Sequence, residues 1–168
     1  LIKDLEKGGL LNRVVEFLPS KNELARRAMA HESMTKPELS VLLSYSKMAL
    51  EMDCASCDFA DDKYFEKYLF NYFPKIMQDK FEDEIRSHPL RADIIRMVAV
   101  NKIANELGGV PIQSIKRETG SSVGDIMKAH AIVTEVLGLD KIWRDVENLG
   151  TSVDVSIRVE MLSALARI

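Results

Sequence analysis

The stretch from Thr35 to Ala49, TKPELSVLLSYSKMA, carries the strongest helix signals in the chain. Thr35 can cap the first free backbone N–H groups, and Glu38, three residues later, can bond back to the backbone of the cap. Pro37 fits the first turn, where a missing backbone donor leaves no bond unmade. Apolar residues then lie on most sides of the helix, so little of its surface is left for water. We therefore predict a central, largely buried helix over this stretch.

Apolar spacing, capping residues and glycine or proline breaks predict the other helices as well. Ser122 and Asp125 form a second predicted capping box, and Gly138 is predicted to end the helix that follows it. Asp140 is predicted to cap the next helix, and Asp154 to lie at the start of the last one. The predicted spans are 1–7 (a short helix or a tail), 10–18, 21–30, 62–72, 74–86, 90–107, 111–118, 123–137, 140–149 and 151–168. No segment alternates with period two between hairpin turns, so we expect essentially no sheet. The predicted fold class is all-α, an irregular multi-helix bundle of about eight to ten helices.

Composition is typical of a globular protein, with 46% hydrophobic and 29% charged residues. A chain of 168 residues is long enough to bury a core of its own. We predict a single helical domain over 1–168, in which 1–34 is a possible lead-in from an upstream domain, 35–150 is the bundle core and 151–168 is a truncated last helix. The chain begins on Leu and ends inside an apolar helix pattern, so we expect a fragment of a longer polypeptide.

Charge and hydropathy exclude several classes of partner. The chain has 23 Lys and Arg against 26 Asp and Glu, a net charge of −3, which lacks the basic footprint of a nucleic-acid-binding protein. No apolar run reaches the ~20 residues that span a bilayer, and the amino terminus has no signal-peptide pattern. We predict no nucleic-acid partner, no membrane partner and a cytoplasmic location.

Cys54 and Cys57 form a CxxC pair, the pattern of half a zinc site or of a redox centre. Zinc needs four ligands, and no second CxxC or nearby Cys/His pair supplies the other two. A thioredoxin-type pair needs a strand before it and a helix that starts at the first Cys, whereas this pair follows a helix. We predict a structural pair with two free thiols and no metal.

An acidic, irregular loop follows the central helix. Its carboxylates are Glu51, Asp53, Asp58, Asp61, Asp62 and Glu66, and Lys63 is the one cation among them. The loop lacks the alternating ligands and mid-loop Gly of an EF-hand, so we predict a solvated loop with Asp61 and Asp62 at a helix start. We expect the largest core side chains among the aromatic residues Phe59, Tyr64, Phe65, Tyr68, Phe70, Tyr72 and Phe73.

No catalytic constellation is visible. His31, His88 and His130 are far apart, and none lies in a metal-binding or nucleophile motif. Gly108-Gly109 follows a predicted helix instead of a strand, so it is not a phosphate-binding loop. We predict no catalytic, cofactor-binding or metal-binding residue in this chain.

Two polar groups have alternative interpretations. Asn101 and Asn105 share a helix face, where they can tie the helix to a neighbouring backbone or mark a binding groove. Arg86, His88 and Arg91 form a basic corner before the same helix. That corner can dock the acidic loop, dock a missing domain, or stay solvated.

A set of short motifs identifies a family in combination. They are VEFLPS (15–20), TKPELSVLLSYSK (35–47), NYFP (71–74), HPLR (88–91), Asn101, NELG (105–108) and ETG (118–120). In this order and spacing they resemble the helical carboxy-terminal region of the large class of bacterial NAD-specific glutamate dehydrogenases. The resemblance covers nearly the whole chain from Leu10. The Cys54/Cys57 loop and the paired Gly108-Gly109 depart from the family pattern.

The resemblance implies a parent enzyme that deaminates L-glutamate oxidatively to 2-oxoglutarate and ammonia and passes hydride to NAD. Its Rossmann domain and catalytic Lys and Asp residues lie upstream, so none of them falls on a position here. We expect a non-catalytic scaffold or regulatory domain without a cofactor of its own, packed on the upstream catalytic domain of a homo-oligomer. Two alternatives are a stand-alone helical interaction module, with a long exposed apolar groove, and an amino-acid-sensing allosteric domain, with a closed pocket of paired charges.

Overall fold

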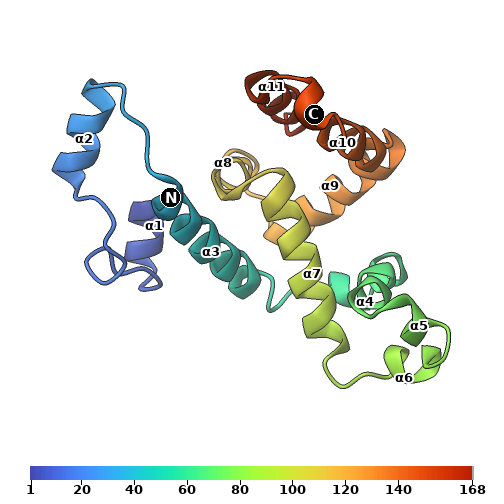
Figure 1. The fold of residues 1–168 in the computed structure, drawn as a ribbon. Helices are drawn as coiled ribbons and strands as arrows, with labels where there is room; N and C mark the ends of the chain where they lie inside the picture. Colours follow the sequence, from blue (N-terminus) through green and yellow to red (C-terminus); the bar gives the residue numbers. More distant parts are fainter. Residues whose placement is uncertain (168) are drawn as a thin grey trace.

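The fold is entirely helical. The computed structural model describes residues 1–167, except for the side chain of Phe59. Over this range it contains eleven α-helices, three short 3-10 helices and no strand (Figure 1). The all-α prediction is confirmed. The described range thus has more α-helices than the predicted eight to ten: the predicted 74–86 segment is two helices, 10–18 is not helical, and each of the other predicted spans, 1–7 included, contains a helix. Phe59, expected in the core, and Ile168, the end of the predicted last helix, lie outside the described side chains and residues.

The helices follow one another with short connections. The α-helices are α1 (Ile2–Lys7), α2 (Lys21–Met29), α3 (Lys36–Asp53), α4 (Glu66–Tyr72), α5 (Lys75–Gln78), α6 (Glu82–Arg86), α7 (Arg91–Glu106), α8 (Gly109–Thr119), α9 (Val123–Val136), α10 (Leu139–Glu147) and α11 (Val155–Leu165). The 3-10 helices are η1 (Asp58–Asp61), η2 (Lys63–Phe65) and η3 (Gly150–Ser152).

Two predicted capping boxes and one predicted glycine stop are confirmed. Thr35 and Glu38 form the predicted capping box of α3, in which the Glu38 carboxylate accepts the Thr35 backbone N–H at 2.7 Å. Ser122 and Asp125 form the second box, at the start of α9. Gly138 follows α9 in the left-handed conformation, φ 63°, which an L side chain adopts only at a cost.

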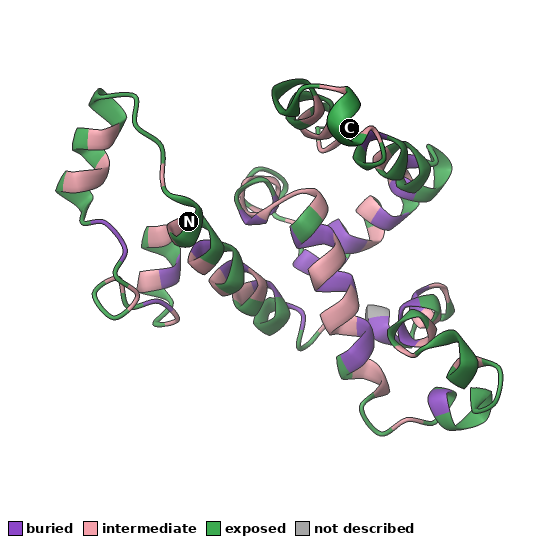
Figure 2. Ribbon diagram, viewed as in Figure 1, coloured by how far each residue is buried: buried purple, intermediate pink, exposed green. Residues whose placement is uncertain are grey.

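The central helix is α7, and the prediction that α3 is central and largely buried was wrong. The buried residues of α7 are Ile94, Ile95, Ala99, Val100, Ile103 and Ala104. It packs against α3, α4, α9 and η1 (Figure 1). Helix α3 buries only Leu42, Ser46 and Leu50, whereas Met48 and Met52 are exposed (Figure 2). Apolar residues on many sides show that a helix has apolar surface, but not that other elements cover it.

Residues 10–18 are not helical, contrary to the prediction. They form turns in which Leu11 and Leu18 are buried, Arg13 and Glu16 are half-buried, and Asn12, Val14, Val15 and Phe17 are exposed. The Asn12 carboxamide oxygen accepts the backbone N–H of Val14 at 3.0 Å, which replaces a helical hydrogen bond. Phe17 has a left-handed backbone, φ 52°, and this ends any regular structure.

Several predicted boundaries shift for local reasons. The predicted 74–86 helix is two helices, α5 and α6. The side-chain amide of Gln78 donates to the backbone carbonyls of Phe70 and Phe73, both at 2.8 Å. These two hydrogen bonds hold α5 against the end of α4. Asp140 does not cap α10, because Gly138 precedes that helix and Asp140 lies in its first turn. Asp154 caps α11, and the 151–153 segment belongs to η3 and its end.

Two hydrophobic clusters hold the chain together. The main cluster surrounds α7 and takes buried residues from α3, α4, α6, α8 and α9 and from the loop after α3. The second cluster is small, and its buried members are Leu5, Leu11, Leu18 and Leu42. The aromatic prediction holds for Phe65 and Tyr68, which are buried in the main cluster, but Tyr72 is exposed. No helix within residues 1–167 has the length and apolar character that crossing a bilayer requires.

Candidate functional site

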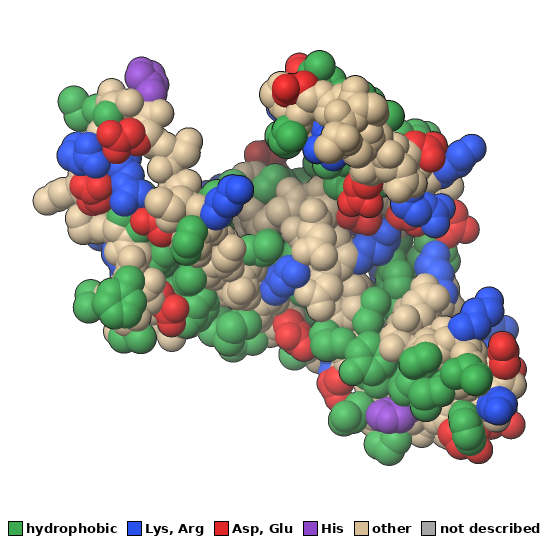
Figure 3. All heavy atoms as spheres, in the orientation of Figure 1, with side chains coloured by type: hydrophobic (Ala, Val, Ile, Leu, Met, Phe, Trp, Pro, Cys, Tyr) green, Lys and Arg blue, Asp and Glu red, His purple; other side chains and the backbone are tan. Residues whose placement is uncertain are grey.

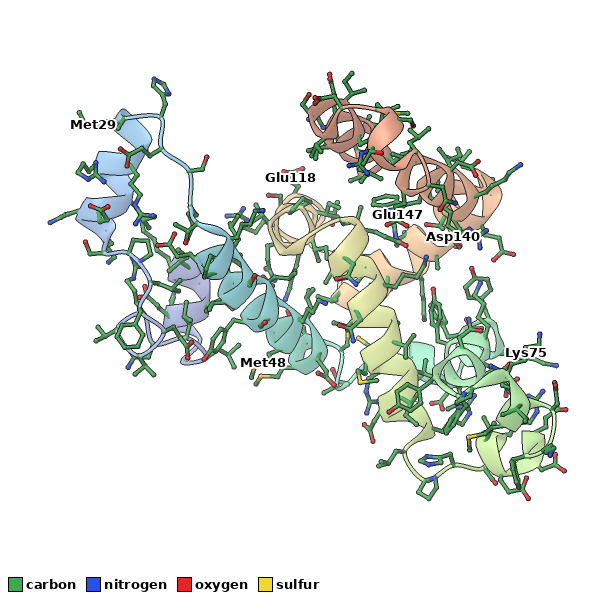
Figure 4. All side chains as sticks on the ribbon, viewed as in Figure 1. Met29, Met48, Lys75, Glu118, Asp140 and Glu147 are labelled. Carbon is green, nitrogen blue, oxygen red and sulfur yellow. The ribbon has the colours of Figure 1, made fainter. Side chains whose placement is uncertain are left out.

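A solvent-open cavity of about 560 Å³ lies between α4, α7, α9 and α10. Its lining residues are Tyr64, Lys67, Tyr68, Asn71, Val98, Lys102, Ala131, Thr134, Glu135, Gly138, Asp140, Lys141 and Arg144. Lys and Arg side chains gather around this hollow in Figure 3. In Figure 4, Asp140 lies on the side of α10 that faces α7 and α4. We call this hollow the cationic cavity, because its walls hold four cations and two carboxylates.

One wall is built around Lys67 on α4. Its ammonium lies 3.7 Å from the centre of the Tyr64 ring and 3.2 Å from a carboxylate oxygen of Glu135. The Tyr64 hydroxyl donates to the carbonyl of Ala131 at 3.3 Å, so the ring is anchored to α9. Tyr64 and Lys67 together hold the pKa of Glu135 below its usual value.

The opposite wall is built around Lys102 on α7. Its ammonium donates to Glu106 at 2.6 Å and to Asp140 at 2.5 Å, which ties α7 to α10. Burial alone would lower the pKa of Lys102, but hydrogen bonds to Asp140 and Glu106 outweigh it and raise that pKa. Glu106 also bonds His130 Nε2 at 2.7 Å. Lys102 is therefore a fixed, fully protonated cation.

Two further cations of the cavity have no counter-ion. Lys141 and Arg144 lie three residues apart on α10, and within the described residues neither makes an ion pair. Thr134 lies in the same wall; its side chain is buried and its hydroxyl has no hydrogen-bond partner in the described structure. The arrangement supplies unpaired donors and positive charge, which is the chemistry of anion binding.

Sequence reasoning missed this cavity. Lys67, Lys102 and Arg144 are separated by dozens of residues, and each alone reads as an ordinary surface cation. The spacing of Lys141 and Arg144, one helical turn apart, was the local signal present. Asn101 and Asn105, which were predicted to tie the helix to a neighbouring backbone or to mark a binding groove, are half-buried and exposed respectively. Neither lines the cationic cavity.

The cysteine pair lies at the joint between α3 and α9. Cys54 is fully buried, with its sulfur 3.3 Å from the sulfur of Met127, and both cysteines are free of a disulfide. Burial, together with the nearby Cys57, raises the pKa of Cys54 to about 12. A Cβ on Gly124 would come within 2.8 Å of the Cys57 sulfur. The Cys54 thiol is thus tightly packed and uncharged, as is typical of a cysteine that serves in packing.

Within residues 1–167, no group of three or more His, Cys, Asp or Glu is placed to hold a metal.

Most carboxylates of the acidic loop are exposed as predicted, but Asp53, Asp58, Asp61 and Glu66 lie within ion-pair distance of cations instead of being merely solvated. Asp53 accepts from Lys116 of α8 at 2.6 Å, and Asp58 accepts from Lys128 of α9 at 3.1 Å. Asp62 accepts the backbone N–H of Tyr64 at 2.9 Å, so its predicted place at a helix start is confirmed. The loop fastens α8 and α9 to the end of α3.

The basic corner docks this same loop, which was the first of its predicted alternatives. Arg86 bonds Glu66, and Arg91 donates to the carbonyl of Ala60 at 3.0 Å and lies 3.9 Å from Asp61. His88 has a local role instead, because its Nδ1 accepts the backbone N–H of Leu90 at 3.1 Å.

The three histidines do not meet. His31 is exposed after α2 with φ 55°, His88 precedes α7, and His130 lies on α9 beside Glu106. Figure 3 shows imidazoles at opposite ends of the molecule. No shared site brings them together.

Comparisons with known proteins agree with one another. Residues 31–168 match the family model described as "Glutamate dehydrogenase, C-terminal". The chain is 36% identical over 168 residues to the NAD-specific glutamate dehydrogenase of Pseudomonas aeruginosa, covering 100% of this chain and 10% of that protein. It is 32% identical over 166 residues to that of Halomonas elongata, covering 99% and 10%. It is 29% identical over 151 residues to that of Mycobacterium tuberculosis, covering 90% and 9%. The chain thus spans about a tenth of the length of these curated relatives. No solved structure matches it.

Proposed function

The chain belongs to the family of glutamate dehydrogenase carboxy-terminal domains, and on this premise we propose that it is a non-catalytic scaffold domain that packs on the catalytic part of an NAD-specific glutamate dehydrogenase. In the proposal, the whole chain oxidises L-glutamate to 2-oxoglutarate and ammonia in the cytoplasm, as a homo-oligomer. NAD binds to the upstream part and not to residues 1–168. We propose that residues 1–34 lead in from that part, that 35–150 form the bundle core and that 151–168 are the terminal segment that contains α11.

An exposed apolar surface carries this proposal. It consists of Val14, Val15 and Phe17 in the loop before α2, together with Met48 and Met52 on α3. Met48 projects from the lower edge of α3 in Figure 4, and apolar side chains line the same lower edge in Figure 3. We call it the loop–helix surface.

The loop of this surface is held in place, although its apolar side chains are in water. The Tyr45 hydroxyl donates to a carboxylate oxygen of Glu16 at 2.7 Å, which fastens the loop to α3. Arg13 donates to the carbonyl of Pro19 at 2.9 Å from the other side. Phe17 is 91% exposed on a left-handed backbone. Burying one such side chain stabilises a complex by about 1.5–3 kcal/mol, so a fixed, exposed Phe favours docking.

The proposed occupant is the catalytic part of the same chain. The relatives that match this chain are about ten times longer, so most of such a protein lies outside the residues described. A surface that is apolar and is formed partly by residues 1–34 is suited to contact the part of the chain that precedes it.

The full-length chain tests this docking. Phe17→Ser should lower the thermal midpoint of the full-length protein and raise hydrogen exchange at 12–18, because an interface anchor is lost. Val136→Ser is the matched control, since Val136 is 76% exposed on α9, away from the loop–helix surface. Equal, negligible effects of both substitutions on the full-length protein would contradict the proposal.

The non-catalytic assignment has its own test. Purified residues 1–168 should reduce no NAD in the presence of L-glutamate. Calorimetric titration of the same segment with NAD should give no micromolar binding signal. A saturable signal in that range would assign cofactor binding to this segment and remove the scaffold assignment.

A further inference from the structure

We propose that the cationic cavity is a binding site for a small organic dianion, of which a dicarboxylate is the simplest form. The inference does not depend on the proposed docking function. It rests on the composition of the cavity wall, on the two cations without counter-ions and on the apolar lining beside them.

The charge balance of the wall favours a dianion. Lys67 is matched by Glu135, and Lys102 by Asp140 and by Glu106, which lies outside the cavity lining and also bonds His130. Lys141 and Arg144 are the two cations left over, in a chain whose net charge is −3. Positive charge is therefore concentrated here against the overall sign of the protein. A ligand with two negative charges would match what remains unpaired.

The lining beside these cations suits a carbon skeleton. The side chains of Tyr68, Val98 and Ala131 form part of the wall, and Tyr68 and Ala131 are buried. A volume of about 560 Å³ falls within the ~300–1,000 Å³ typical of small-molecule sites. A mostly apolar lining with a few placed polar groups is also typical of such sites. Inorganic phosphate would use the cations and leave this lining unfilled.

The wall also holds donors that are not charged. Thr134 places an unpartnered hydroxyl in α9, and Asn71 adds a carboxamide from α4. A carboxylate oxygen has lone pairs for both a cation and a neutral donor. A zwitterionic amino acid fits less well, because the two carboxylates that could receive its ammonium group, Glu135 and Asp140, are already paired with Lys67 and Lys102.

Lysine acetylation in the full-length chain, read by mass spectrometry, gives a local test. We expect succinate to slow the acetylation of Lys141 and Lys67 in a saturable manner, at constant ionic strength. Acetate, with a single carboxylate, should protect them only at much higher concentration. Lys75 on α5, which lies away from the cavity (Figure 4), serves as the internal control. This readout is insensitive to ligand bound at a distant active site.

Variants then test the assigned residues. In Lys141→Gln/Arg144→Gln, the succinate concentration that half-protects Lys67 should rise about tenfold or more, as expected for the loss of charged hydrogen bonds. Lys75→Gln should leave that concentration unchanged. Circular dichroism should show that the double variant is folded, because both side chains are exposed.

Three results would overturn the inference. They are equal protection of Lys75 and Lys141, equal potency of acetate and succinate, and an unchanged midpoint in the double variant. Protection by inorganic phosphate without protection by succinate would reject the organic class of ligand.

Discussion

The regions around α7 and around α3 are built from similar helices but differ in how many residues of the helix are buried. Each helix has apolar residues on several sides, yet α7 buries six residues and α3 three. The difference lies in their neighbours. Helix α7 is surrounded by α3, α4, α9 and η1, whereas the amino-terminal half of α3 is covered mainly by α1 and the turns that follow it. Burial is thus a property of the assembly, and a helix with an uncovered apolar side is available for a partner.

The largest expected effect comes from matched leucine substitutions in the two clusters. Leu69→Ala removes a fully buried side chain of the main cluster and should lower the free energy of unfolding by about 2–5 kcal/mol. Leu11→Ala, in the small second cluster, should cost less, because the turns around it can close over the gap. Guanidinium denaturation of both variants measures the difference. Equal losses would mean that the two clusters form one cooperative core.

An intermediate effect is expected where the two regions join. Gly109 at the start of α8 lies so close to α3 that an added Cβ would overlap the Ser46 side chain. Gly109→Ala should therefore push α8 away from α3 and destabilise the chain by about 1–3 kcal/mol. Val110→Ala is the control, because Val110 in the same turn is exposed. Equal midpoints of thermal unfolding for the two variants would show that α8 packs less tightly on α3 at Gly109 than the structure indicates.

The smallest expected effect is a pH dependence confined to the amino-terminal region. Arg13 holds the pKa of Glu6 below its usual value through the hydrogen bonds that it donates to the Glu6 carboxylate. A carboxylate with a lowered folded-state pKa stabilises the fold above the unfolded value and loses that contribution as the pH falls through the folded value. Hydrogen exchange of residues 5–18 should therefore speed up below about pH 4.5, relative to α7, after correction for intrinsic rates.

Arg13→Gln separates this effect from general acid unfolding. In that variant the amino-terminal region should already exchange faster at neutral pH and should lose its extra acid sensitivity. An unchanged pH profile would assign the sensitivity to other carboxylates.

Local structure was readable from the sequence, and long-range structure was not. The boxes at Thr35 and Ser122 and the stop at Gly138 depend on residues within four positions of one another, and all were predicted. The helix expected at 10–18 failed because the Asn12 side chain competes for the same backbone donors. The family was recognised from its motifs, and the comparisons confirm it.

The cationic cavity could not be predicted for a related reason. It lies between α4, α7, α9 and α10, and its residues Lys67 and Lys141 are far apart in the sequence. Local sequence patterns carry no information about which residues of different helices lie close together in the fold. The assignment of no catalytic residue in this chain stays a prediction.

The ion pairs of the acidic loop have one further consequence. Asp53, Asp58 and Glu66 lie within fourteen positions of one another, but their cationic partners come from α8, α9 and α6. Exposed pairs of this kind are weak one by one and are screened by dissolved salt. Helices α6, α8 and α9 also pack in the main cluster, so these ion pairs add a second connection that ties all three to one short stretch of the chain. Sodium chloride weakens that connection without affecting the apolar interior, which makes the fine adjustment of helix orientation depend on ionic strength.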